Sequence, residues 1–326
     1  MRIVAVTRVL NEADVVEAFV RHTAAHVDHH ILLDNGSLDG TSDILLQLKA
    51  EGSNITLLKT SVPFHHEEKS NEFMFRSAVV KHGADWVSFL DADEFIDIKQ
   101  TGADFPSILD QVKSDIPCVR VFMANYVATN TDEAFERLVT SRIRFRRAVS
   151  NVPKVILRAS LLNRDVRIVN GNHGAYVDGG RACPWHDEHS LHLAHFPERS
   201  KPQAIAKYAR GWARALAAGS RCTGAGTSGH YRVPFEMLRD QPDRLINHSD
   251  FAVVNSTQNL IHDPVSYRGG ALRYTPDINE PMRAIQTFVG YVETLARHHG
   301  RLLDECPEAR AVSAQWANEY VRAETT

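Results

Sequence analysis

The chain has 326 residues, of which 43% are hydrophobic and 24% are charged, so it is long enough to bury a substantial core. Its net charge of −3 gives no bulk attraction to nucleic acid, which we exclude as a partner. The cysteines include no C-x-x-C pair, which argues against a zinc knuckle or a disulfide framework.

The N-terminal segment favours a cytoplasmic protein. Residues 1–10 resemble a first core strand, too short for a secretion signal, and no run of eighteen apolar residues is present. We therefore expect no transmembrane segment. Peripheral contact with the inner face of a membrane stays open.

The first hundred residues alternate apolar strands with amphipathic helices. The expected strands are 3–6, 30–33, 55–58 and 86–90. The expected helices begin near Asn11, Thr41 and Ser70, with Asn11 and Thr41 as N-caps. Strands separated by helices of this length predict βαβ units and a largely parallel sheet, hence an α/β fold.

Beyond residue 100 the pattern changes to longer strands and then to helices. The expected strands are 117–126, 138–145, 152–158, 165–170 and 190–195. The expected helices are 200–219, 281–300 and 307–324, with a glycine-rich mobile loop at 221–230.

Two carboxylates, Asp91 and Asp93, follow the apolar strand at 86–90. A spacing of two residues at a strand end places both side chains on the same side of the backbone. Oxygen ligands suit Mg²⁺ or Mn²⁺, which usually complete their shells with substrate phosphates. Asn11 and Asp34 follow two other strands and fall at the same edge of the sheet, where ligands bind. The D-x-D triplet alone would fit a solvated turn equally well, but this convergence favours a metal-diphosphate site.

The order of motifs resembles the family-2-like glycosyltransferases of the GT-A fold, in particular a subgroup related to family 92. The resemblance is carried by NE at 11–12, LDNGSLDGT at 33–41 and DADEF at 91–95. It is strong over residues 1–100, weaker from there to about Lys201, and absent from the last eighty residues.

This resemblance implies a metal-dependent transferase that moves a sugar from a nucleoside-diphosphate donor, here expected to be a UDP-sugar, to an acceptor hydroxyl with inversion. By the same resemblance, Asp34 meets the nucleoside, and Asn11 and Glu12 lie beside the base. Asp91 and Asp93 hold the Mn²⁺ or Mg²⁺, and His195 supplies a third ligand. The acceptor would be a saccharide, a lipid-linked sugar or another hydroxyl compound.

Further roles follow from position. Lys201 is our candidate for a basic group near the diphosphate, and Arg76 lies on the helix before the metal strand, where it could face the donor. Related enzymes place a general base about a hundred residues after the metal pair, which indicates Asp187 or Glu188. Each of the two would also fit a solvated loop.

The expected organisation is a GT-A domain at 1–220 and an extension at 221–326. Within the domain, residues 1–100 form the nucleotide-sugar half and 101–220 the acceptor half. The extension comprises the mobile loop and helices, which either cover the acceptor side or mediate a homodimer.

Two alternatives remain open. A nucleotidyltransferase acting on sugar phosphates would also use Mg²⁺, but no glycine-rich phosphate loop follows the first strand. A nucleotide-sugar-binding protein that has lost catalysis is opposed by the intact Asp91 and Asp93.

Overall fold

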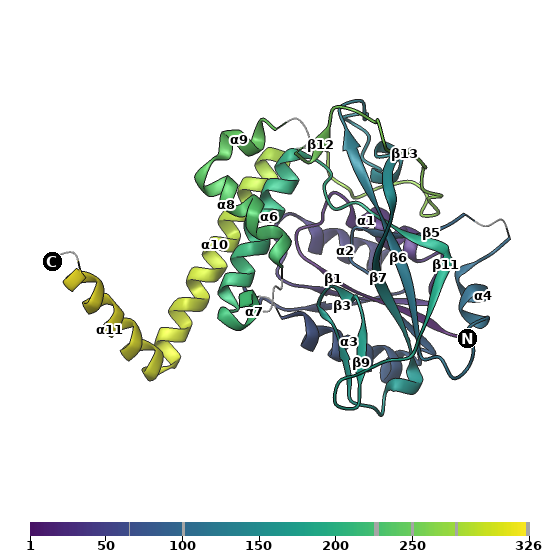
Figure 1. Ribbon diagram of the computed structural model, residues 1–326, viewed down its shortest axis with the longest axis horizontal. Helices are drawn as coiled ribbons and strands as arrows, with labels where there is room; N and C mark the ends of the chain where they lie inside the picture. Colours follow the sequence, from purple (N-terminus) through teal and green to yellow (C-terminus); the bar gives the residue numbers. More distant parts are fainter. Residues whose placement is uncertain (65, 100–101, 225–227, 249–250, 278–279, 324–326) are drawn as a thin grey trace.

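The computed structural model describes residues 1–64, 66–99, 102–224, 228–248, 251–277 and 280–323. A ten-stranded sheet forms its centre, helices cover both faces, and a group of C-terminal helices stands beside it (Figure 1). The predicted α/β class, with flanking helices and a helical C-terminal part, is confirmed.

The first half of the sheet is parallel and has the order β3-β2-β1-β4. Its strands are β1 (Ile3–Val9), β2 (His29–Asp34), β3 (Ile55–Lys59) and β4 (Trp86–Phe89). The connecting helices are α1 (Val16–Thr23), α2 (Thr41–Ala50) and α3 (Glu67–His82). All four strands end at the same edge, which we call the carboxyl edge.

The second half mixes strand directions, with the order β4-β7-β6-β11-β5. Its strands are β5 (Glu94–Ile98), β6 (Cys118–Thr129), β7 (Phe145–Arg158) and β11 (Trp185–His195), extended by β12 (Val253–Val254) and β13 (Ile261–His262). Because β7 is antiparallel to both β4 and β6, and β6 is parallel to β11, the end of β11 lies at the carboxyl edge. A separate small sheet contains β8 (Val166–Ile168), β9 (Ala175–Val177) and β10 (Arg181–Ala182).

Two apolar cores lie on the two faces of the sheet. One includes Phe19 of α1 and Leu45 of α2, and the other includes Met74 and Phe75 of α3. The strands β1, β2 and β4 are almost wholly buried, which explains why their sequences are largely apolar runs.

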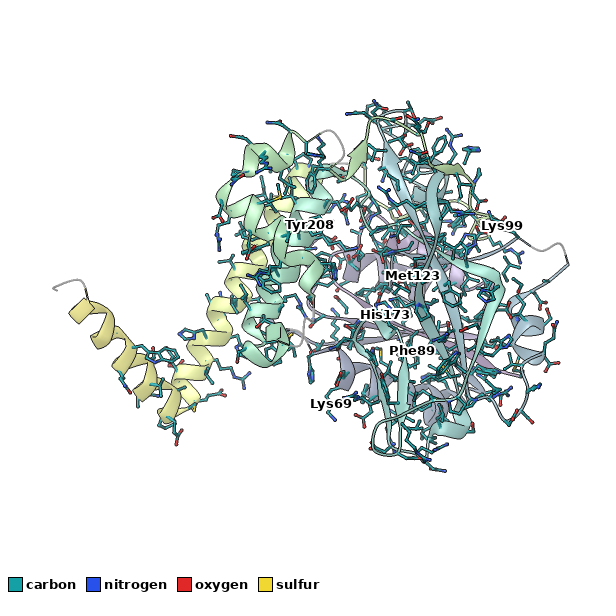
Figure 2. The ribbon with its side chains drawn as sticks, in the orientation of Figure 1. Lys69, Phe89, Lys99, Met123, His173 and Tyr208 are labelled. Atoms are coloured by element: carbon teal, nitrogen blue, oxygen red, sulfur yellow. The ribbon has the colours of Figure 1, made fainter. Side chains whose placement is uncertain are left out.

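The remaining helices are α4 (Phe105–Asp110), α5 (Val139–Arg142), α6 (Lys201–Ala217), α7 (Ser220–Gly224), α8 (Arg232–Asp240), α9 (Pro242–Ile246), α10 (Glu280–Glu305) and α11 (Pro307–Ala323). In Figure 1, α6, α8 and α10 pack together, while α11 projects away from the body. Side chains crowd the sheet and stand far apart along α11 (Figure 2). Among the described residues, no helix combines the length and apolarity needed to cross a bilayer.

Several expected elements need correction. The expected strand at 138–145 is instead the short helix α5, and β7 begins only at Phe145. Asn11 does not cap α1, whose N-cap is Val15, and Gly40 takes the cap position of α2 that was expected for Thr41. Part of the expected mobile loop forms α7, and its residues 225–227 lie outside the described residues.

Candidate active site

Four strand ends bring charged side chains together at the carboxyl edge. The loops after β1, β2 and β4 carry Glu12, Asp34 and the pair Asp91/Asp93. His195 ends β11 and lies opposite Glu94 in the antiparallel pairing of β11 with β5. Glu94 directly follows the aspartate pair in the sequence. These residues thus lie at one edge of the sheet, where the parallel order of β1, β2 and β4 brings the ends of these strands together.

Asp91 is paired with a buried lysine from β7. Lys154 is 3% exposed and donates to Asp91, and its Nζ lies 2.9 Å from a carboxylate oxygen of Glu94. Burial opposes the charge of Lys154, but Asp91 and Glu94 outweigh it and raise the pKa of the lysine above its usual range. Asp91 also lies 3.9 Å from Arg8, so two cations from two strands face this carboxylate.

Asp93 is buried and surrounded by cationic groups. Lys207 of α6 donates to it at 2.7 Å, and Arg199 lies 3.8 Å away. Burial raises the pKa of Asp93, but Lys207, His195 and Arg199 outweigh that effect and lower it well below its usual range. Asp93 is therefore ionised in the folded protein at neutral pH.

His195 is 3.7 Å from Asp93, and its Nδ1 is 2.8 Å from the amide oxygen of Asn125. Since that oxygen can only accept, Nδ1 carries the hydrogen and Nε2 keeps its lone pair. Burial lowers the pKa of His195 to about 4, so the ring is neutral at pH 7. A neutral ring with a free Nε2 lone pair can act as a metal ligand or accept a hydrogen bond.

Arg199 connects the second half of the chain to the first loop. Its fully buried guanidinium bonds to Glu12 at 2.5 Å and to Asp14 at 2.7 Å. Burial raises the pKa of Glu12 to about 7. Glu12 is thus engaged by Arg199 in this structure.

Asp34 and Asn11 hold the nucleotide-side loops together. Asp34 is 4% exposed and accepts from the Ser37 backbone at 3.0 Å, the Ser37 hydroxyl at 2.7 Å and the Ser42 hydroxyl. Asn11 adopts a left-handed conformation (φ 58°) and accepts the Leu38 N–H at 2.8 Å. These contacts fix the shape of this part of the carboxyl edge.

The site suits a metal ion that arrives with its ligand. Among the described residues, no group of three or more His, Cys, Asp or Glu side chains forms a ready metal cage. Mg²⁺ typically takes only one or two protein carboxylates and adds water and substrate phosphates. The oxygen donors of Asp91 and Asp93 fit such an ion, provided that it displaces Lys154 and Lys207 from those carboxylates.

The two expected general bases, Asp187 and Glu188, lie away from the aspartate pair in this structure. Asp187 forms a two-point ion pair with Arg120, with bonds of 2.6 and 2.7 Å, near the beginning of β11. Glu188 is next to it and bonds to the Ser190 backbone at 2.7 Å. On the neighbouring strand β6, their partners Arg120 and Asn125 are five residues apart, so about 17 Å separates Asp187 from His195, and a bulge between Glu188 and His192 takes up the extra residues of β11. Neither acid reaches the aspartate pair, because β11 runs toward the carboxyl edge and both lie at its opposite end.

Two expected donor contacts are also displaced. Lys201 begins α6 and donates to the Ile246 carbonyl at 2.8 Å, away from the aspartate pair. Arg76 is exposed and reaches the Leu162 carbonyl at 3.5 Å. The cation that α6 does bring to the site is Lys207, nearly two turns beyond Lys201.

Sequence reasoning missed Lys154 and Lys207. Lys154 could have been recognised from the sequence, because it is a single charge at the start of the apolar run at 154–157. A lysine in such a run is expected to be buried, and buried lysines are rare unless they are paired. Lys207 had none, because one lysine on an amphipathic helix normally faces solvent.

Comparisons with solved structures find glycosyltransferases. The mannosyltransferase PcManGT from Pyrobaculum calidifontis, in complex with GDP-Man and Mn²⁺, matches with a TM-score of 0.36 and 11% identity over 89% of this chain and 87% of its own. Glucosyl-3-phosphoglycerate synthase from Mycobacterium tuberculosis, in complex with Mn²⁺, UDP and glucosyl-3-phosphoglycerate, matches with a TM-score of 0.26 and 19% identity. That match covers 37% of this chain and 44% of the synthase. The bifunctional glycosyltransferase WbbM matches with a TM-score of 0.27 and 18% identity, over 37% of this chain and 23% of its own.

The match thus spans less than half the length of the last two structures. No known family profile matches the chain. No curated protein matches it in sequence. At these identities and TM-scores the similarity carries no argument about this chain's activity, which has to come from its own residues.

Proposed function

We propose that this protein is a glycosyltransferase that uses a nucleoside-diphosphate sugar, with a UDP-sugar as the first candidate, and transfers the sugar to an acceptor hydroxyl. One observation carries the proposal: Asp91 and Asp93, at the end of β4, each lie against a lysine contributed by a distant element. Such a cluster of fixed charges at the carboxyl edge suits a ligand with a diphosphate.

The cluster can stabilise the leaving group. Transfer breaks the bond between the anomeric carbon and the phosphate oxygen, so negative charge grows on the departing diphosphate. A metal ion on Asp91 and Asp93 would release Lys154 and Lys207 from these carboxylates, and both ammonium groups would then face the departing diphosphate. A Mg²⁺ or Mn²⁺ held by Asp91, Asp93 and His195 would add Lewis-acid stabilisation of the same diphosphate.

The remaining parts of the proposal concern binding and stereochemistry. Asn11 and Asp34 would support the nucleoside through the loops that they hold together. The acceptor is a saccharide, a lipid-linked sugar or another hydroxyl compound. We propose inversion of the configuration at the anomeric carbon from the family resemblance alone. Proton NMR of the product, which reports its anomeric configuration, tests this part of the proposal.

The decisive experiment is calorimetry with Mn²⁺ and UDP, separately and together. We expect Mn²⁺ alone to bind weakly, because lysines already neutralise both aspartates, and UDP with Mn²⁺ to bind tightly. A preference for a nucleoside triphosphate would favour a nucleotidyltransferase. UDP binding without turnover of any sugar nucleotide would favour a protein that only binds.

Asp93→Asn tests the site directly. Removing this fixed charge should lower kcat/KM by about a hundredfold or more while the far-ultraviolet circular dichroism stays unchanged. Asp187→Asn is the matched control: it breaks only a partly exposed pair at the other end of β11 and should leave turnover intact. Full activity in Asp93→Asn would refute the assignment.

A further inference from the structure

Helix α6 carries three cations on one face. Lys207, Arg210 and Arg214 are spaced by three and four residues, so they line up along the helix, and we call them the α6 cation row. Lys207 reaches Asp93, whereas Arg214 donates to the carbonyls of Val62 and Phe64 in the loop after β3, at 3.1 and 3.0 Å. The row therefore runs along the carboxyl edge from the aspartate pair toward the nucleotide side.

Two members of the row, the buried Arg210 and the half-buried Arg214, have no acidic partner among the described residues. Arg210 is 8% exposed and donates a hydrogen bond to the Thr287 hydroxyl of α10, at 2.7 Å. Among the described residues, no carboxylate forms an ion pair with Arg210 or Arg214. Burying a charge without a counter-ion is costly. Burial lowers the pKa of Arg210, and it lowers that of Arg214 to about 10, so both stay charged at neutral pH.

Both arginines border a hollow between the strand loops and α10. Its lining includes Asn11, Asn35 and Ser61 from the loops after β1, β2 and β3. The lining contains two arginines and no acidic residue, which is the charge pattern of an anion site.

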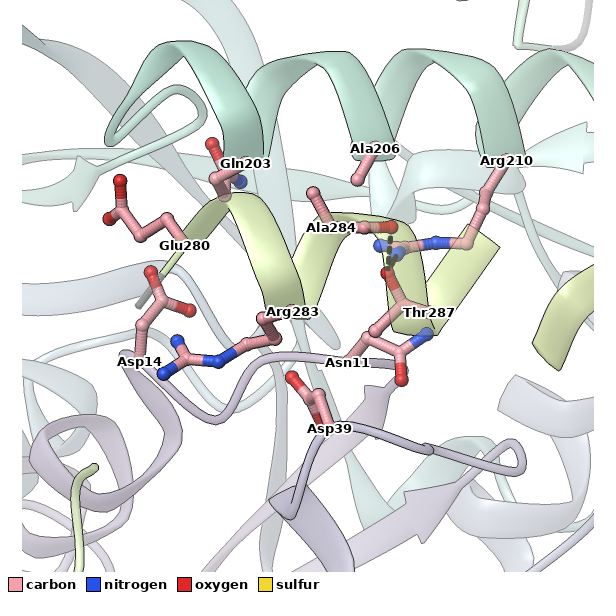
Figure 3. Close-up of a pocket in the computed structure, with 10 residues that line it drawn as sticks. All are labelled: Asn11, Asp14, Asp39, Gln203, Ala206, Arg210, Glu280, Arg283, Ala284 and Thr287. Atoms are coloured by element: carbon pink, nitrogen blue, oxygen red, sulfur yellow. Dashed lines mark hydrogen bonds between the residues drawn. The ribbon is translucent and has the colours of Figure 1, made fainter. Parts of the chain in front are cut away.

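A neighbouring hollow differs in charge (Figure 3). It shares Asn11, Arg210 and Thr287 with the first but is also lined by acids. Two of these acids are engaged: Asp14 pairs with Arg199, and Asp39 accepts hydrogen bonds from Thr41 and the Ala13 backbone. The acid-free hollow is thus the better place for an anion.

We propose that Arg210 and Arg214 form an anion subsite that binds a phosphate group. Guanidinium groups recognise phosphate by charged, two-point hydrogen bonds, and a bound phosphate would supply the missing counter-charge. The proposal deepens the proposed function, on which it rests for the donor: the row would guide the diphosphate from this hollow to Lys207. A phosphorylated acceptor would present the same chemistry.

The test is calorimetry at pH 7 with UDP, uridine and glycerol 1-phosphate, on wild type and Arg210→Met. We expect Arg210→Met to weaken UDP binding by about ten- to a hundredfold and to leave uridine binding unchanged. If Arg210→Met loses affinity for glycerol 1-phosphate but not for UDP, the subsite is supported and the phosphate that it binds belongs to the acceptor. Unchanged affinity for both phosphates, or no phosphate binding by the wild type, would overturn it.

Controls separate this subsite from folding and from the proposed function. Arg297→Met removes an exposed arginine of α10 and should change nothing. Arg210→Met should unfold no more easily than wild type, because the lost charge had no partner; if it fails to fold, Arg210→Lys must still show a smaller loss of the same sign. If glycerol 1-phosphate binds through Arg210 while UDP does not bind at all, the subsite stands and the donor proposal fails.

Discussion

His26 and His30 are buried near the start of the parallel sheet and are neutral in the folded protein. Burial lowers the pKa of each to about 3. His30 bonds to the Thr7 hydroxyl at 2.9 Å, whereas Nε2 of His26 has no hydrogen-bond partner among the described residues. Both rings would gain a proton on unfolding below about pH 6.5.

We predict that His26→Leu makes stability less sensitive to acid. The unfolded state binds the extra proton, so wild-type stability falls as the pH drops from 6.5 toward 3, by up to about 1.4 kcal/mol per pH unit for each histidine. Buried acids act in the opposite direction, since the pKa of Glu12 is raised to about 7. Urea unfolding measures the free energy of unfolding of wild type and His26→Leu at pH 7 and at pH 5. The contribution of the buried acids is the same in both proteins and cancels in the comparison. The fall in this free energy from pH 7 to pH 5 should be about 2 kcal/mol larger for wild type.

The charged groups that face His26 are His22 and Arg268, and both disfavour its protonation. His299→Leu is the control, because this histidine of α10 is exposed in the folded protein. Parallel pH profiles for wild type and His26→Leu would show that His26 takes up its proton without unfolding.

At the level of residues, sequence reasoning located the acids and missed their partners. Asp91 and Asp93 were recognisable because Asn11 and Asp34 fall at the same edge of the predicted sheet, whereas the D-x-D triplet alone also fits a solvated turn. Their cations come from β7 and α6, which are more than sixty residues away in the chain. Local patterns could not reveal such pairs, and the same lack of distance information placed Asp187 and Glu188 in the site.

At the level of elements, side chains of neighbouring segments pack closely against helix α6, which forms one side of the site. Gly211 lies in the middle of this helix, where glycine is normally unfavourable. The ring of Tyr231 explains it: a β-carbon at position 211 would lie 2.4 Å from that ring. The glycine thus lets Tyr231 pack directly onto the helix.

We predict that Gly211→Ala destabilises the protein by about 1–3 kcal/mol, as overpacking does. In an open helix the same change stabilises by about 1 kcal/mol, and Gly300→Ala in α10, where nothing lies within 4 Å, should do so. Thermal unfolding of both variants gives the comparison. Adding Tyr231→Ala should remove the penalty of Gly211→Ala; a penalty that persists would mean that the ring is not its cause.

The elements themselves were partly predictable. The strands β1, β2 and β4 were found because buried parallel strands are apolar runs, whereas β5 was not expected from the sequence. The expected strand at 138–145 was wrong because its alternating arginines imitate an exposed strand face. Arg142 is in fact buried within the short helix α5, so long-range packing overrode the local alternation.

At the level of the whole molecule, α10 and α11 form an arm that extends away from the sheet (Figure 1), and α10 exposes several large apolar side chains. One side of α10 packs on the body through Thr287 and Tyr291, whose hydroxyl donates to the Pro63 carbonyl at 3.2 Å. The other side presents a stripe that is at least half exposed: Met282, Ile285, Val289 and Val292. Large exposed apolar patches usually mark interaction surfaces.

We predict that a second copy of the chain covers this stripe. Helices that bind anionic membranes are rich in lysine and arginine on their polar face, whereas acidic and basic residues are nearly balanced over 280–323. A symmetric dimer would bury the stripe against itself. Light scattering of the 36.5 kDa chain should therefore give twice that mass.

Val289→Glu should convert the dimer to a monomer, because a carboxylate at the centre of the stripe would be buried without a partner. Val80→Glu is the matched control, since Val80 is 67% exposed on α3, far along the chain from the arm, and its variant should stay dimeric. A wild-type chain that is monomeric at tens of micromolar would contradict the dimer. A dimer that survives Val289→Glu would place the interface on another surface.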